Sequence, residues 1–140
     1  MLENAKNTKA QGDIGEAAAL LYFNLQDFPV SIPFGDNQRY DLIVEFPEGL
    51  KRVQVKTTRY KKKTDGKFEV ALRTRWSDRN KTTTRFLDDT EIDLLFIYTA
   101  EGDIYLIPSK DLTAKSALIL GEKYKEYHKG RLGMSEPTSL

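Results

Sequence analysis

Asp41, Gln54 and Lys56 are the residues whose types and spacing best suit chemistry. Gln54 and Lys56 are two positions apart, which in a strand places both side chains on one face, about 6.6–6.8 Å apart. Carboxylate and amide oxygens are ligands for a hard cation such as Mg²⁺, which can activate a water and neutralise a phosphate. A neighbouring lysine can stabilise charge on that phosphate or orient and deprotonate the water. The three residues therefore suit metal-assisted hydrolysis of a phosphodiester.

The two segments that carry these side chains are predicted to pair as antiparallel strands, because apolar and polar residues alternate along both. The segments are 40–46 and 51–57, joined by a turn at 47–50. Pairing of Phe46 with Lys51 would place Asp41 opposite Lys56. The alternative explanation is a cross-strand Asp–Lys pair that only stabilises a sheet face.

A helix is predicted from Gln11 to about Asp27, because apolar residues recur there at spacings of three and four. The helix is apolar well beyond one stripe, so we expect it to be packed on more than one side. Glu16 is unusual in this setting, since Leu20 and Phe23 share its face. A carboxylate in apolar surroundings needs a cation, a metal or a hydrogen-bond donor. Glu16 is therefore a candidate to reach the same metal.

Two more hairpins are predicted further along the chain. Asp65-Gly66 is a strong turn signal and leads into a strand at 68–73, giving a sheet of at least four strands. Segments 92–98 and 103–107 form another hairpin, whose almost continuous apolar content indicates buried strands. The polar, threonine-rich segment 77–85 is expected to be an exposed loop that meets DNA, or else a plain linker.

Positive charge is concentrated in the middle of the chain. The segment 51–85 carries thirteen basic and three acidic residues, a net charge of +10, whereas the rest carries nine basic and eighteen acidic residues, a net charge of −9. Such a segment steers phosphates, and its aromatic residues Tyr60, Phe68 and Trp76 favour nucleic-acid binding over a merely solvated surface. The residues predicted to contact DNA are Arg59, Lys61, Lys62, Lys63, Arg73, Arg75, Lys81 and Arg85.

Composition excludes several other classes of protein. At 140 residues the chain is expected to form a single domain, with a core at about 12–112 and the basic segment at about 51–85. The absence of cysteine excludes disulfides, thiol nucleophiles and cysteine–zinc sites, and one histidine excludes multi-histidine metal sites. There is no long apolar run and no apolar signal segment at the start, so we expect a cytoplasmic protein without membrane contact.

Several segments resemble the PD-(D/E)XK nuclease superfamily. They are Gly12-Asp13-Ile14-Gly15-Glu16, Arg39-Tyr40-Asp41-Leu42-Ile43-Val44 and Val53-Gln54-Val55-Lys56-Thr57. Segments 92–98 and 103–108 further resemble the group I intron-encoded homing endonuclease branch. Together the resemblance covers roughly residues 12–112.

This resemblance implies a restriction-endonuclease-like α/β core, with a mixed β-sheet flanked by helices. It also implies Mg²⁺-dependent cleavage of double-stranded DNA, with one or two ions per site, by a homo-oligomer (dimer or tetramer) that brings two sites to the duplex. Asp41 matches the metal-binding aspartate, Lys56 the catalytic lysine and Glu16 the helix glutamate, whereas Gln54 stands where most members have an acidic residue. The implied metal ligands are Asp41, Gln54 and Glu16. Tyr40 replaces the usual proline.

The leading hypothesis is therefore a site-specific homing-type endonuclease, in which a strand bearing Arg73 and Arg75 reads the major groove. A structure-selective nuclease, such as a Holliday junction resolvase, would share the same core. A catalytically inactive DNA-binding module is the third possibility, because Gln54 removes one negative metal ligand. The glutamine is tolerated in the homing-endonuclease branch, which favours the first hypothesis.

Overall fold

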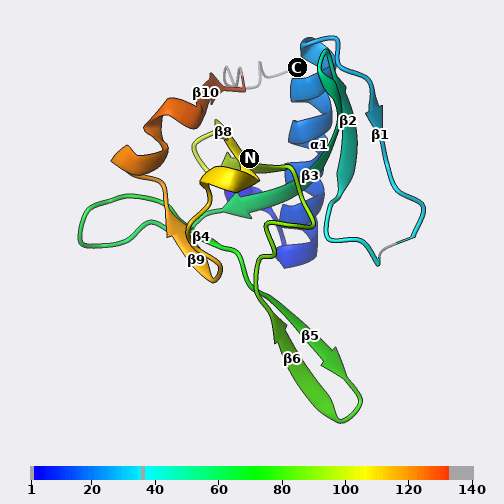
Figure 1. Ribbon diagram of the computed structural model, residues 1–140. Coiled ribbons are helices and arrows are strands. Elements are labelled where there is room, and N and C mark those ends of the chain that lie inside the picture. Colours follow the sequence, from blue (N-terminus) through cyan, green and yellow to red (C-terminus); the bar gives the residue numbers. More distant parts are fainter. Residues whose placement is uncertain (1, 36, 133–140) are drawn as a thin grey trace, which may run out of the picture.

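The computed structural model describes residues 2–35 and 37–132, without the side chains of residues 3 and 76–78 (Figure 1). Its elements are η1 (Leu2–Asn4), α1 (Thr8–Leu25), β1 (Val30–Ser31), β2 (Leu42–Phe46), β3 (Gly49–Thr58), β4 (Glu69–Ala71), β5 (Thr74–Asp78), β6 (Lys81–Arg85), β7 (Leu94–Thr99), β8 (Asp103–Pro108), η2 (Ser109–Asp111), β9 (Ala117–Ile119), η3 (Glu122–Tyr127) and β10 (His128–Arg131). Among the described residues, no helix is both long and apolar enough to cross a membrane.

A six-stranded sheet forms the framework, in the order β1-β2-β3-β7-β8-β10. The central pair β3 and β7 is parallel, and the pairs on either side are antiparallel, so the sheet is mixed. This confirms the predicted α/β fold with a mixed sheet. Two small two-stranded sheets, β4–β9 and β5–β6, lie outside the six-stranded sheet.

The central strand β7 is buried on both faces. Leu95 and Ile97 belong to one apolar cluster, and Phe96 and Tyr98 belong to another on the opposite face, as expected because side chains alternate along a strand. A strand that is covered on both faces needs an almost continuous apolar sequence. Segment 92–98, which was predicted to be a buried strand, has such a sequence. The predicted hairpin of residues 92–98 and 103–107 is thus present, and burial is confirmed for β7, whereas β8 is buried only at Ile104 and Ile107.

Helix α1 covers one face of the sheet. It begins at Thr8, earlier than predicted, because the Asn7 side chain caps it by accepting a hydrogen bond from the Ala10 amide (2.9 Å). The expectation that the helix is packed on more than one side is wrong, since Leu21 and Leu25 are 48% and 67% exposed. One helix face packs on the sheet, and a second apolar stripe faces outward.

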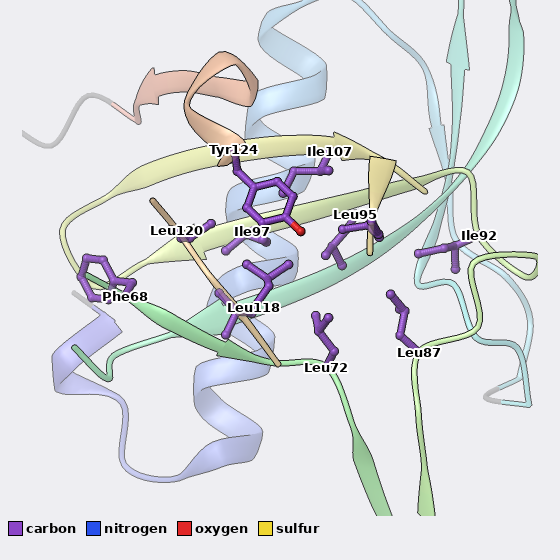
Figure 2. Close-up of a cluster of buried hydrophobic side chains, with 12 residues drawn as sticks. Phe68, Leu72, Leu87, Ile92, Leu95, Ile97, Ile107, Leu118, Leu120 and Tyr124 are labelled. Carbon is purple, nitrogen blue, oxygen red and sulfur yellow. The ribbon is translucent and has the colours of Figure 1, made fainter. Parts of the chain in front are cut away.

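The other face of the sheet is covered by β4, β9 and η3. Figure 2 shows Phe68, Leu118 and Tyr124 from these parts of the chain gathered over Leu95 and Ile97 of β7, on the side away from α1. The predicted turn at residues 64–67 is present, but the strand that follows it pairs with β9 instead of joining the main sheet. This face is therefore covered mainly by short strands and turns, not by a second α-helix.

The β2–β3 hairpin has a tighter turn than predicted. Phe46 pairs with Gly49 and not with Lys51, so two residues lie between the strands. Gly49 has a positive φ of 139°, a conformation open to glycine. The predicted pairing of Asp41 with Lys56 is therefore wrong by two residues. Because the shift is even, each side chain keeps its predicted face.

The segment 77–85 is not a loop. Strands β5 and β6 pair from Thr74–Arg85 at the base to Asp78–Lys81 near the tip, and the hairpin projects from the body of the molecule (Figure 1). All five residues of β6 are exposed, as predicted. A hairpin that is solvated on both faces needs no apolar alternation, which explains why no strand pattern was visible. We call residues 74–85 the β5–β6 arm.

Candidate active site

A cavity of about 600 Å³ opens where β2, β3 and the base of the β5–β6 arm meet. It brings together three of the predicted site residues, Asp41, Gln54 and Lys56. The complete lining is Asn37, Gln38, Arg39, Asp41, Gln54, Val55, Lys56, Thr74, Arg75 and Arg85. Four basic side chains and one carboxylate therefore surround a single space, which suits a ligand with negative charge.

Asp41 is fixed immediately before β2 by two backbone contacts. Its amide donates to the Val53 carbonyl (2.8 Å), and its Oδ2 accepts a hydrogen bond from the Val55 amide (2.7 Å). Burial raises the pKa of Asp41, although the bond from Val55 and the charge of Lys56 oppose this shift. The carboxylate is thus held rigidly beside Gln54 while its second oxygen can bind another group.

Gln54 supplies the least usual feature of the cavity. Its Oε1 is buried and accepts no hydrogen bond from any described residue. Gln54 lines the cavity, and leaving its buried oxygen without a partner is unfavourable, so the site favours a ligand or donor that satisfies this oxygen. Among the described residues, no cluster of three or more His, Cys, Asp or Glu side chains suits a metal. The donor set in the cavity is instead the amide oxygen of Gln54 with the carboxylate of Asp41.

Lys56 points into the same cavity from β3. Burial lowers the pKa of its amine, the charge of Asp41 opposes this effect, and the charge of Arg39 lowers the pKa further. Its Nζ makes a long hydrogen bond to Thr74 Oγ1 (3.5 Å). An ammonium group has three donors, so Lys56 can also contact a phosphate oxygen and a water.

Glu16 reaches this region from α1, and it does so because the helix lies close to β3. Gly15 allows the approach, since a Cβ at that position would lie 2.3 Å from Thr57 Cγ2. Gln11 Nε2 also donates to Thr57 Oγ1 (2.8 Å). The side chain of Glu16 is exposed, so the expected apolar surroundings are absent, and it is not part of the cavity lining. Its partial burial and the nearby charge of Asp41 raise the pKa of Glu16.

The predicted DNA-contacting residues fall into two groups. Arg75 and Arg85 line the cavity, and Lys81 is exposed at the far end of the arm. The others are not part of the cavity lining: Arg59, Lys61, Lys62, Lys63 and Arg73. Of these, Lys61 pairs with Glu101 and lies over the Phe68 ring, and Arg73 Nη1 donates to Ser116 Oγ (3.0 Å). The side chain of Trp76, which the sequence also singled out, lies outside the described part of the chain.

Sequence reasoning missed two residues of the cavity that carry specific contacts. Arg39 Nε pairs with Glu91 Oε2 (2.9 Å), and Arg39 Nη1 donates to the Phe86 carbonyl (3.2 Å). The sequence offered one signal for Arg39: it stands two residues before Asp41, and alternate residues of an extended chain point to the same side. Thr74 had no such signal, since its place depends on a hairpin that the sequence pattern did not reveal.

This arrangement can bind a divalent cation through oxygen ligands and place a phosphate between that cation, Lys56 and the arginines. Asp41, whose pKa is raised, shares the cavity with the unpartnered amide oxygen of Gln54, and this pair fits a cation, because its charge would favour the ionised carboxylate. The residues present therefore fit a hard metal ion.

Comparisons with known proteins agree with this chemistry. The sequence matches the family model of the PD-(D/E)XK endonucleases over residues 6–133. The fold is similar to that of a bacterial homing endonuclease, I-Ssp6803I, with a TM-score of 0.74 and 26% sequence identity, covering 87% of this chain and 88% of that one. No curated protein matches the sequence. Because the family match spans most of the chain, this protein belongs to the PD-(D/E)XK endonuclease family and is a deoxyribonuclease.

Proposed function

We propose that this nuclease is a Mg²⁺-dependent, site-specific endonuclease of the homing type that cuts double-stranded DNA. The observation that carries the proposal is the buried, unpartnered Oε1 of Gln54 in a cavity shared with Asp41 and Lys56. The similarity to a homing endonuclease over most of both chains supports the homing type. Gln54 then acts as a ligand, and its presence in place of a carboxylate does not indicate loss of activity.

In this proposal Asp41 and Gln54 bind the ion and Glu16 completes the site, directly or through water. When bound, Mg²⁺ would stabilise negative charge on the scissile phosphate and lower the pKa of a nearby water. A neutral amide in place of a second carboxylate favours one ion per site over two, because each cation site depends on the charge of its ligands. Lys56 contacts the attacking water or the phosphate.

The arginines at the base of the β5–β6 arm hold the DNA over the cavity. Arg75 and Arg85 line the same space as the chemical groups, so a duplex bound by the arm lies against the site. An arm of two strands is narrow enough for a major groove, where arginine can bind guanine through two hydrogen bonds. Lys81 and the lysines of the 61–63 turn would contact phosphates.

A homo-oligomer would supply the second active site that cleavage of both DNA strands requires. The outward stripe of α1, with Leu21 and Leu25, is one apolar surface on which two copies could associate. Exposed Ile32 and Phe34, which follow β1, add further apolar area. Size-exclusion chromatography with light scattering would test this, and a monomer at all concentrations would contradict it.

The decisive experiment is cleavage of a pool of long linear duplexes and a four-way junction, with Mg²⁺ or EDTA. The pool must include the uninterrupted form of the locus that carries the gene. We expect Mg²⁺-dependent cutting at one duplex site, and we expect Lys56→Ala to abolish it while DNA binding is retained. Equal loss of cutting and binding in Lys56→Ala would contradict the catalytic role of the lysine.

Other outcomes of this experiment would identify the rival functions. Preferential cutting of the junction would indicate a junction-resolving nuclease. Tight binding without cutting would indicate an inactive binding module. A Gln54→Glu variant tests the ligand role separately, because an added negative charge should lower the Mg²⁺ concentration for half-maximal cleavage by about tenfold. An unchanged Mg²⁺ requirement would argue against Gln54 as a ligand.

A further inference from the structure

The base of the β5–β6 arm is bonded to the candidate active site on both of its strands. Thr74, the first residue of β5, accepts a hydrogen bond from Lys56 Nζ (3.5 Å). Phe86, which follows β6, accepts one from Arg39 Nη1 (3.2 Å), and Arg39 also pairs with Glu91 (2.9 Å). Thr74 pairs with Arg85 across the arm, so these contacts join one short piece of hairpin to the cavity.

Just below these contacts the arm is anchored in the core. Leu72 and Leu87 are buried, at 2% and 5% exposure, and both belong to the apolar cluster of Figure 2. Their amides donate to the carbonyls of Ser116 and Lys115 (2.8 and 3.0 Å). The chain is thus fixed at Leu72 and Leu87, whereas all five residues of β6 are exposed. A change in the angle of the arm would therefore reach the cavity through Thr74 and its cross-strand partner Arg85, which both line it.

The amine of Lys56 depends on Thr74 for its position. Among the described residues, Thr74 Oγ1 is the atom to which Lys56 Nζ makes a hydrogen bond, and the charge of Asp41 adds an attraction nearby. A lysine side chain has four rotatable carbon–carbon bonds, so an amine without such a contact samples many positions. Contacts that are long in a free enzyme commonly shorten when substrate binds.

We propose that Thr74 is a positioning residue that couples DNA recognition by the arm to cleavage. When the arm is seated on its target, the Thr74 hydroxyl holds the Lys56 amine at the reacting phosphate. When the arm is seated badly, the amine is misplaced although the DNA is bound. The enzyme then distinguishes its target from other DNA sequences by the rate of cleavage as well as by the affinity of binding. This inference rests on the proposed function, because it takes Lys56 as the group at the phosphate.

Three variants test the role of the hydroxyl. Thr74→Val removes it at nearly constant volume, and Thr74→Ser keeps it. Thr113→Val makes the same change at an exposed threonine outside the cavity and the arm, whose hydroxyl also accepts a hydrogen bond from a lysine, Lys123. Cleavage is measured under single-turnover conditions with Mg²⁺, and the Kd for the same duplex is measured in EDTA. We expect the Thr74→Val variant to cut DNA about 10- to 100-fold more slowly, because it loses a hydrogen bond to a charged group. Its Kd for the duplex should change by less than about twofold.

The controls define what would overturn the inference. Thr74→Ser and Thr113→Val are expected to cut within about threefold of the wild-type rate. Equal rates for Thr74→Val and the wild type would overturn it, as would equal slowing by valine and serine. A defect of Thr74→Val confined to Kd would also overturn it, because it would assign Thr74 to binding. Matching melting temperatures would show that the variants are folded.

A second measurement does not require activity. Acylation of the Lys56 amine in the free protein, quantified by mass spectrometry with exposed Lys63 as the reference, should rise several-fold in Thr74→Val but not in Thr74→Ser. Unchanged labelling would show that Thr74 does not hold Lys56. A wild-type protein that cuts no DNA would instead overturn the proposed function and the kinetic part of this inference, whereas the labelling would still decide the contact.

Discussion

Strand β7 and the β5–β6 arm are two opposite environments for β-structure within one chain. In β7 the residues 95–99 are all buried, whereas in β6 the residues 81–85 are all exposed. Packing therefore explains the apolar sequence of β7, and it does not explain the Lys, Thr and Arg residues of β6. The difference teaches that stability resides in the sheet and α1, and that the composition of the arm reflects what the arm binds.

The same difference separates the two parts of the candidate site. Asp41, Gln54 and Lys56 are held by strands of the sheet, which gives the chemical groups a rigid support. Arg75 and Arg85 belong to the arm, whose base is fixed to the core at Leu72 and Leu87. Substitutions in the sheet should therefore change stability or chemistry, and substitutions in the arm should change DNA binding with little effect on folding.

The largest expected effect on stability is at the contact between α1 and β3. Gly15→Ala should destabilise the protein by up to about 3 kcal/mol, because the new Cβ would lie 2.3 Å from Thr57 Cγ2 and force the helix away from the strand. The measurement is urea unfolding followed by circular dichroism. Cleavage should also fall, because Glu16 would move with the helix.

Gly12→Ala is the matched control in the same helix. A Cβ at Gly12 meets nothing within 4 Å, so this change should stabilise the protein by about 0.5–1 kcal/mol through helix propensity. If both alanine variants changed the unfolding free energy alike, the close approach at Gly15 would not be what positions α1.

The next largest effect should be on DNA binding by the arm. In Arg75→Ala/Arg85→Ala we expect Kd to rise about tenfold or more and the slope of log K against log salt to fall by about 0.9 for each lost phosphate contact. Lys62→Ala/Lys63→Ala, in the turn outside the cavity lining, should have a smaller effect. Filter binding over a range of salt concentrations measures both. A larger effect from the lysine pair would place the DNA surface at the turn.

Neither double variant should alter the melting temperature by more than a degree or two, because exposed charges away from the core contribute little to folding. Marked destabilisation by the Arg75/Arg85 changes would show that the arm is part of the folding unit. It would thereby remove the distinction between the arm and the sheet.

The elements that the sequence predicted well are those with a local pattern. Alternation predicted β2 and β3, and a continuous apolar run predicted β7, because burial on one or both faces leaves such patterns. The β2–β3 register was wrong by two residues, since turn length is set by local backbone geometry at Gly49. The even shift kept every side chain on its face, so the predicted cavity residues still came together.

The arm and its contacts could not be predicted in this way. A hairpin that is exposed on both faces has no apolar period, so 77–85 resembled a loop. The roles of Arg39 and Thr74 depend on long-range contacts with Phe86 and Lys56, which no local pattern encodes. Burial of the Gln54 oxygen likewise became visible only in three dimensions.

The smallest expected effect concerns the link between the parallel strands β3 and β7. Asp93 Oδ2 accepts hydrogen bonds from the Arg52 amide (2.7 Å) and Nε (3.1 Å), and Oδ1 accepts one from Nη2 (3.2 Å). The hydrogen bond from the Arg52 side chain is the main reason that the pKa of Asp93 is lowered. Asp93→Asn should destabilise the protein by about 1 kcal/mol at pH 7, a modest value because both side chains are partly solvated.

This contribution should depend on pH in a defined direction. A carboxyl whose pKa is lower in the folded state stabilises the protein above its unfolded pKa of about 3.9, and the stabilisation is lost as pH falls through the folded pKa. The difference in unfolding free energy between wild type and Asp93→Asn should therefore be constant from pH 7 to 5 and shrink below about pH 4. Urea unfolding at pH 7, 5 and 3.5 measures it. DNA binding by Asp93→Asn at pH 7 should be unchanged, because the arm is not involved. A difference in unfolding free energy that stayed the same at pH 3.5 would show that the charge of Asp93 does not stabilise the sheet.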